Sequence, residues 1–111
     1  MIAIYKTIGS ELRSVQDFEP GCWVKVMAPE LGELEQLVTR FGIPLDFLTD
    51  PLDVDERARI EREEGVALII LRVPRLDAYD ADVPFTTLPI GIICGVLSVA
   101  FSVSLAGTSS A

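Results

Sequence analysis

The run from Val66 to Val73, VALIILRV, constrains the fold more than any other part of the chain. It is almost continuously apolar and rich in β-branched residues, a pattern typical of a strand that is buried on both faces. Such a strand needs helices or another layer above and below it, because each apolar face must be kept from water. The run therefore predicts an α/β domain with a sheet at its centre.

Shorter β patterns lie on both sides of this run. The first two flank a turn at Ile8–Ser10 and predict an N-terminal hairpin. In the third, a central strand, Trp23 is expected to be an anchor of the core. The fourth has one apolar position, which predicts an edge strand, and a turn at Glu64-Gly65 joins it to the fifth. The predicted strands are Ile2–Lys6, Glu11–Val15, Cys22–Met27, Arg59–Arg62, Val66–Val73, Phe85–Ile93 (with a bend expected at Pro89) and Val96–Val103.

One helix is predicted over Pro29–Phe41. Proline is well tolerated at the first helical position, because its missing N–H has no partner there. Gly42 suits the left-handed conformation that ends many helices. The apolar residues recur with a period of 3.6, so we expect them to form the buried face. They are Leu31, Leu34, Leu37, Val38 and Phe41.

A second, shorter helix is predicted over Leu45–Asp50, with Pro51 ending it. Leu45, Phe47 and Leu48 are expected to supply its apolar contacts. Asp53, followed three residues later by Glu56, has the spacing of a capping box, which predicts one further helical turn.

The last part of the chain carries no charge from Val83 onward. Leu88–Ala106 is mostly apolar, close to the roughly 20 residues that a helix needs to cross a bilayer. Pro89 and the glycines oppose a helix, so a strand is preferred and a spanning helix is the alternative. Cys94-Gly95 predicts a short turn in this region. We expect residues 1–105 to form the domain and 106–111 a disordered tail.

The charge balance excludes several classes of function. Seventeen acidic residues face nine basic ones, with no histidine, and the net charge is −8. This balance argues against binding nucleic acid or anionic lipid, both of which need a basic surface. It suits cations or basic partners, although solubility is its commonest meaning. Cys22 and Cys94 lie in apolar runs and are expected to be buried, reduced thiols. The N-terminus shows no signal peptide.

Five carboxylates gather between the second helix and the edge strand: Asp46, Asp50, Asp53, Asp55 and Glu56. Mg²⁺ usually takes one or two carboxylates and keeps several waters, so a weakly held Mg²⁺ or other divalent cation is possible here. Asp50, Asp53, Asp55 and Glu56 are the candidate ligands. The alternative is that Asp50 and Asp53 cap helices, while Asp55 and Glu56 pair with Arg57 and Arg59.

The other acidic loop contains Asp77, Asp80 and Asp82. It lacks the glycine and the terminal glutamate of a calcium loop, so we interpret it as a solvated loop. A catalytic role finds no support, because there is no histidine base, no Gly-x-Ser-x-Gly sequence and no phosphate-binding glycine loop.

Seven segments occur in an order typical of one known family. They are Gly21–Val24 (GCWV), Ala28-Pro29, Glu33–Glu35 (ELE), Phe41–Leu48 (FGIPLDFL), Leu52–Glu61 (LDVDERARIE), Leu68–Pro74 (LIILRVP) and Leu88–Ile93 (LPIGII). Together they resemble the N-terminal cytoplasmic domain of CorA-type magnesium transporters. The likeness covers about Ile4 to Ile93.

The resemblance implies an α/β/α sandwich on a mixed β-sheet, which would be incomplete here at its C-terminal end. In the family, a long stalk helix and two membrane-spanning helices follow this domain and form a homopentameric pore for divalent cations. The family's Gly-Met-Asn motif does not occur in this sequence. We therefore expect a fragment at the cytoplasmic face of the membrane, tied to it only through missing C-terminal helices. No regulatory metal ligand can be carried over residue by residue.

A second hypothesis is a stand-alone acidic α/β module that binds a protein partner. The fragment hypothesis carries a physical expectation of its own. Without later helices, one face of the Val66–Val73 strand would stay open, and the isolated piece would aggregate or oligomerise.

Overall fold

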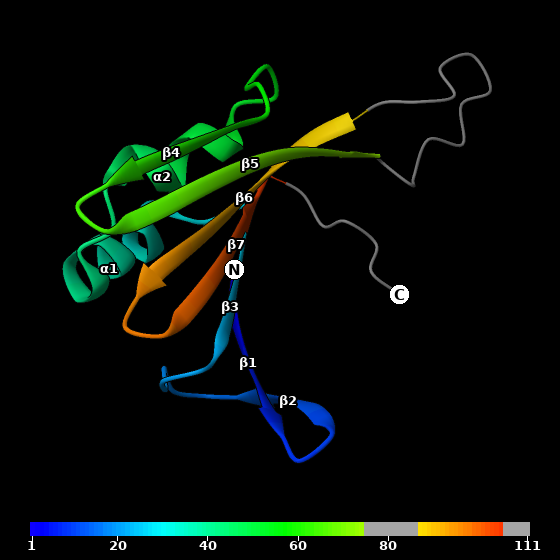
Figure 1. Ribbon diagram of the computed structural model, residues 1–111, viewed down its shortest axis with the longest axis vertical. Helices are drawn as coiled ribbons and strands as arrows, with labels where there is room; N and C mark the ends of the chain where they lie inside the picture. Colours follow the sequence, from blue (N-terminus) through cyan, green and yellow to red (C-terminus); the bar gives the residue numbers. More distant parts are fainter. Residues whose placement is uncertain (75–86, 106–111) are drawn as a thin grey trace.

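The computed structural model describes residues 1–74 and 87–105, which form a mixed seven-stranded sheet (Figure 1). The strand order is β2-β1-β3-β7-β6-β5-β4. Neighbouring strands run antiparallel except β3 and β7, which pair in parallel. The strands are β1 (Ile2–Ile8), β2 (Glu11–Val15), β3 (Trp23–Met27), β4 (Arg59–Glu63), β5 (Val66–Pro74), β6 (Thr87–Val96) and β7 (Val99–Ser104). The predicted hairpin, the central strand and the edge strand β4 are confirmed.

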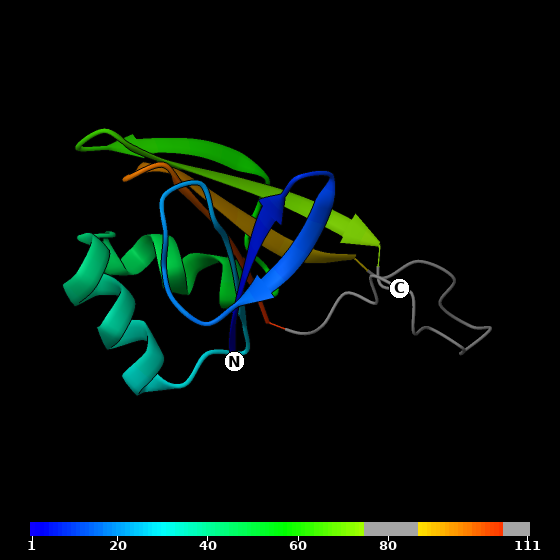
Figure 2. The same cartoon turned by 90° about the horizontal axis from the view of Figure 1, so that it is seen from below.

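The helices lie between β3 and β4 in the chain and cover one face of the sheet (Figure 2). They are α1 (Leu31–Phe41), α2 (Leu45–Thr49) and the 3₁₀ helix η1 (Asp50–Leu52). The core fills the space between these helices and the sheet. Its side chains with no exposed surface are Val24, Val26, Leu37, Leu48, Leu68, Ile70, Ile93, Phe101 and Val103.

Helix α1 begins at Leu31, so the prediction that Pro29 is its first residue is wrong. Glu30 is the N-cap, and its N–H donates to the Glu33 carboxylate at 3.0 Å, which fixes the start of the helix two residues later. Leu34 and Leu37 are buried as expected, but Leu31 in the first turn is 71% exposed. Gly42 ends the helix in the left-handed conformation, at φ 67°.

The chain between α1 and β4 differs from expectation in three ways. Leu45 is exposed, because only Phe47 and Leu48 of α2 face the sheet. Pro51 continues the helical path as part of η1, where proline is tolerated in the first turn. The further helical turn at Asp53 is absent. The chain makes a short turn there instead, closed by a hydrogen bond from Glu56 N–H to the Asp53 carbonyl at 3.0 Å.

The sheet has one covered face and one open face in the described part of the chain. On β5, Val66, Leu68 and Ile70 are buried under the helices, whereas Ile69 is half-buried on the opposite face. The expectation that β5 is buried on both faces is therefore wrong within this structure. Trp23 also lies on the open face and is 40% exposed, so it is not the predicted core anchor.

The uncharged region forms strands, as preferred. Pairing of β6 with β5 continues without a break through Pro89. No helix in the described residues is both long enough and apolar enough to span a bilayer. The predicted turn at Cys94-Gly95 is wrong, because β6 runs on to Val96 with a bulge and the hairpin turns at Leu97-Ser98. The acidic loop at 77–82, the start of the predicted Phe85 strand and the predicted tail at 106–111 lie outside the described residues.

The open face should make the isolated 111-residue chain self-associate. Ile60 and Leu71 are 65% and 45% exposed there, beside the half-buried Ile69 and Ile92. Apolar patches of this kind favour association. We expect sedimentation velocity to show oligomers or aggregates. The double substitution Ile60→Lys and Leu71→Lys should return the chain toward monomer.

A matched control is Leu31→Lys, because Leu31 is as exposed as Ile60 but lies on α1, away from the open face. This variant should sediment like the unmodified chain. A monodisperse monomer of the unmodified chain would contradict the prediction.

Candidate functional site

The charged side chains of the helix-to-sheet connection gather around Arg59 at the start of β4. Its Nη2 lies 2.7 Å from Asp50 Oδ2 and 3.4 Å from Glu61 Oε2, and its Nη1 pairs with the Glu56 carboxylate. All four side chains are partly buried, with 23–42% of their surface exposed. Three carboxylates around one guanidinium leave an excess of negative charge, so the cluster is electrostatically asymmetric.

This asymmetry appears in the pKa values. Burial, followed by the charge of Glu56, raises the pKa of Asp50 above its ordinary value, although Arg59 opposes the change. For Arg59, partial burial works in the opposite direction, but the charges of Glu56 and Glu61 raise the pKa of the guanidinium. The fold therefore favours the charged form of Arg59 and disfavours the charged form of Asp50.

Asp53 and Asp55 stand apart from this cluster. Asp53 Oδ1 accepts a hydrogen bond from Asp55 N–H at 3.0 Å, which closes a local turn. Both residues are exposed. The expected pairing of Glu56 with Arg59 is present, whereas Arg57 forms no salt bridge with any described residue.

A second arginine holds the same connection to the sheet, and the sequence pattern gave no role for it. Arg72, on β5, donates to the backbone carbonyls of Val54 and Glu56 at 3.0 and 2.7 Å. It also bonds the Thr87 hydroxyl and the Thr87 carbonyl, each at 2.9 Å. Its one signal in the sequence is that it is the charged residue within the apolar Val66–Val73 run.

The four candidate metal ligands do not converge as a set. Within residues 1–74 and 87–105, no three acidic or cysteine side chains form a group that could hold a metal ion. Asp50 and Glu56 face one another across Arg59, which occupies the place that a cation would take. A divalent cation with one or two carboxylate ligands would therefore have to bind beside the guanidinium or displace it. The weak Mg²⁺ site remains a prediction.

Removing the positive charge of this cluster should destabilise the domain. Arg59→Met leaves three carboxylates close together without a counter-charge, so we expect a loss of about 1–2 kcal/mol at pH 7. Asp50→Asn removes a carboxylate whose charged form is disfavoured, and should change stability by less than about 0.5 kcal/mol. Urea unfolding followed by circular dichroism measures both.

The pH dependence of the domain's stability follows from the raised pKa of Asp50. Because the pKa of Asp50 is raised in the fold, its ionisation lowers stability as pH rises above the ordinary aspartate value and through the raised value. The Arg59→Met deficit should begin to shrink as pH falls through the raised pKa of Asp50, and should be smallest below about pH 4, the ordinary range of carboxylates. A deficit that stays constant across this range would contradict a charge-based cause.

The fold and the site together define a mixed α/β domain with an acidic connection and one open sheet face. A family model described as CorA-like Mg²⁺ transporter protein matches residues 19–96. The chain therefore belongs to the CorA-like Mg²⁺ transporter family. No curated protein matches it.

The solved structures that share the fold include two of CorA. The soluble domain of CorA from Methanocaldococcus jannaschii has a TM-score of 0.76 at 24% identity, covering 97% of this chain and 42% of that one. The complete CorA magnesium transporter from the same organism has a TM-score of 0.70 at 23% identity, covering 96% of this chain and 33% of that one. This chain thus spans less than half the length of either structure. At these identities the likeness shows the fold alone.

Proposed function

We propose that this chain is the regulatory, cation-sensing cytoplasmic domain of a CorA-type divalent cation transporter. The observation that carries the proposal is the family match over residues 19–96, together with a sheet like that of a CorA soluble domain. In this proposal the domain works within a homopentamer at the cytoplasmic face of the cell membrane. Transport itself requires membrane-spanning parts of a longer protein, and the domain has no catalytic role.

Two features of the domain fit this role. The net charge of −8 repels nucleic acid and concentrates cations near the surface. The open face of the sheet is suited to packing against further elements of a larger assembly, since half-buried aliphatic side chains line it. Regulation by Mg²⁺ would use weak binding. One or two carboxylates of the connection, beside Arg59 or in its place, would be the protein ligands.

Calorimetry and thermal unfolding with Mg²⁺ test cation sensing directly. We expect stabilisation that saturates at millimolar Mg²⁺, compared with NaCl at the same ionic strength, because a ligand that binds the folded state raises its stability. Combining Asp50→Asn with Glu56→Gln should reduce this response. Lys25→Gln, which changes a charge on the far face, is the control.

The open face also favours a second candidate, a stand-alone module that binds a protein partner through this surface. The same titration separates the two. No heat and no stabilisation up to millimolar Mg²⁺ would contradict cation sensing and favour the partner-binding module.

A further inference from the structure

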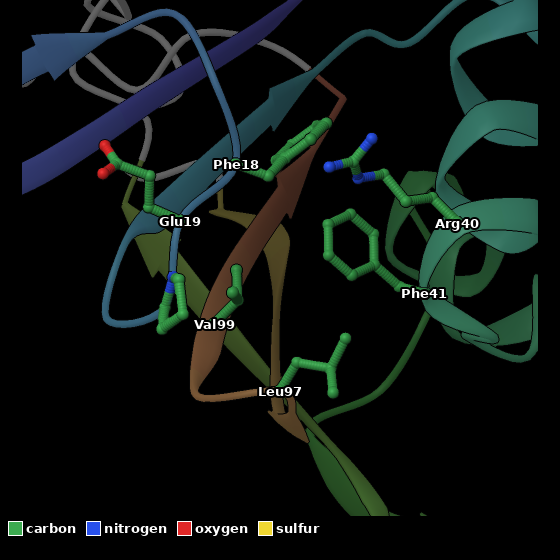
Figure 3. Close-up of a pocket in the computed structure, with 7 residues that line it drawn as sticks. Phe18, Glu19, Arg40, Phe41, Leu97 and Val99 are labelled. Atoms are coloured by element: carbon green, nitrogen blue, oxygen red, sulfur yellow. The ribbon is translucent and has the colours of Figure 1, made fainter.

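A hollow of about 320 Å³ lies at one end of the covered face, between the β2–β3 connection, the end of α1 and the β6–β7 turn (Figure 3). It is lined by Phe18, Glu19, Pro20, Arg40, Phe41, Leu97 and Val99. Its volume falls at the lower end of the range for small-molecule sites. None of the acidic residues discussed above takes part in it.

Aromatic rings form the wall and floor of the hollow. Phe41 meets Phe18 edge to face, with ring centroids 4.9 Å apart, and meets the buried Phe101 in the same way at 5.0 Å. Val99, which is 4% exposed, completes the apolar surface. Phe101 does not line the hollow itself, but it belongs to the core and supports the Phe41 ring from behind.

A cation lies on this aromatic surface. The Arg40 guanidinium is 5.0 Å from the centroid of Phe18 and 5.9 Å from that of Phe41, and Figure 3 shows it reaching from α1 toward Phe18. In the described part of the chain, no carboxylate forms a salt bridge with Arg40, unlike Arg13 and Arg59. Its donors are therefore available to a ligand, in a chain whose net charge is −8.

The remaining side of the hollow is a strained turn. Leu97 and Ser98 have φ values of 48° and 60°, in the left-handed region that asparagine and glycine usually occupy in such hairpins. Leu97 is also 71% exposed at the rim. The left-handed backbone conformation costs free energy for a bulky residue such as Leu97. Strained residues of this kind cluster at functional sites.

We propose that this hollow binds a small organic anion with an aromatic body and a single carboxylate. The ring packs against Phe18, Phe41 and Leu97, and the carboxylate accepts hydrogen bonds from the Arg40 fork. Glu19 does not neutralise Arg40, since its carboxylate points away from the hollow in Figure 3 and pairs with Lys6 at 3.4 Å. The site is separate from the acidic connection and does not depend on the proposed transport role.

Equilibrium dialysis of the unmodified chain with phenylacetate and with neutral phenylacetamide tests the proposal. The two probes have the same ring and nearly the same size, so the ratio of their dissociation constants measures the contribution of the negative charge. We expect phenylacetate to bind about 3- to 10-fold more tightly, as one exposed charge-assisted hydrogen-bonding pair allows. Arg40→Met should remove this preference, while Arg62→Met, an exposed arginine on β4, should leave it unchanged.

The variant Leu97→Asn separates binding from folding. Asparagine tolerates the left-handed conformation, so the melting temperature should stay the same or rise, while phenylacetate binding weakens because apolar contact is lost. Equal affinity for the two probes, an unchanged preference in Arg40→Met, or unchanged binding in Leu97→Asn would overturn the proposal.

Discussion

Replacement of Phe101 by alanine is expected to lower the unfolding free energy by about 3–5 kcal/mol. The ring has no exposed surface, lies on the central strand β7 and packs against Phe41 at 5.0 Å. Its removal leaves a cavity between the sheet and α1 that the surrounding side chains cannot fill. Urea unfolding gives the free energy, and the milder Phe101→Leu keeps the test readable if the alanine variant does not fold.

The matched control is Trp23→Ala. Trp23 sits on β3, one strand away, but on the open face with 40% of its surface exposed. The loss should be less than half of that for Phe101→Ala, because most of the hydrophobic contribution comes from complete burial. Equal losses at the two positions would show that the open face is as well packed as the covered one.

Gly95→Ala should be strongly destabilising for a change of one methyl group, at about 2–4 kcal/mol. Gly95 has φ 96°, which alanine adopts poorly, and a Cβ there would lie 2.4 Å from the Gly65 carbonyl oxygen. The obstacle is backbone of the β4–β5 turn, which cannot move aside as a flexible side chain would. The thermal midpoint and the urea midpoint should both fall.

The same substitution at Gly32 is the control. Gly32 lies in α1 with nothing within 4 Å of a new Cβ. Alanine should stabilise the helix there by roughly 0.5–1 kcal/mol, because it loses less conformational freedom on folding. If both variants shifted stability in the same direction, the close approach of Gly95 to the β4–β5 turn would be in doubt.

Elements with strong local signals could be predicted from the sequence. The β-branched runs located the strands, and Gly42 located the end of α1. Gly65 marked the turn of the β4–β5 hairpin, and the charged residues of Arg59–Glu63 indicated that β4 is an edge strand. In each case, residues close in sequence carry the information, so no knowledge of packing was needed.

Predictions that depended on tertiary packing failed. A period of 3.6 placed Leu31 on the buried face of α1, but the first turn projects beyond the edge of the core. Trp23 fits the alternating pattern of β3, but that pattern does not show which face of the sheet the helices cover. The Leu97-Ser98 turn lacks the usual Asn-Gly signal, so a glycine two residues earlier was mistaken for the turn.

The candidate site shows the same division. Charge density located the cluster, and the alternative to a metal site included the pairing of Glu56 with Arg59 that the structure shows. The contribution of Arg72 depends on hydrogen bonds to residues 15 to 18 positions away in the chain, which the sequence pattern does not contain. The hollow at Arg40 joins three segments that are distant in sequence, and it could be found only in the structure.

Cation sensing within a transporter is tested most directly in a chimera. Residues 1–105 would replace the matching segment of the complete Methanocaldococcus jannaschii CorA, and Mg²⁺ uptake into proteoliposomes would be measured while Mg²⁺ on the domain's side is varied. We predict uptake that is inhibited by millimolar Mg²⁺ on that side, with weaker inhibition in the Asp50→Asn, Glu56→Gln chimera. An assembled chimera whose uptake ignores Mg²⁺ on the domain's side would contradict the proposed function.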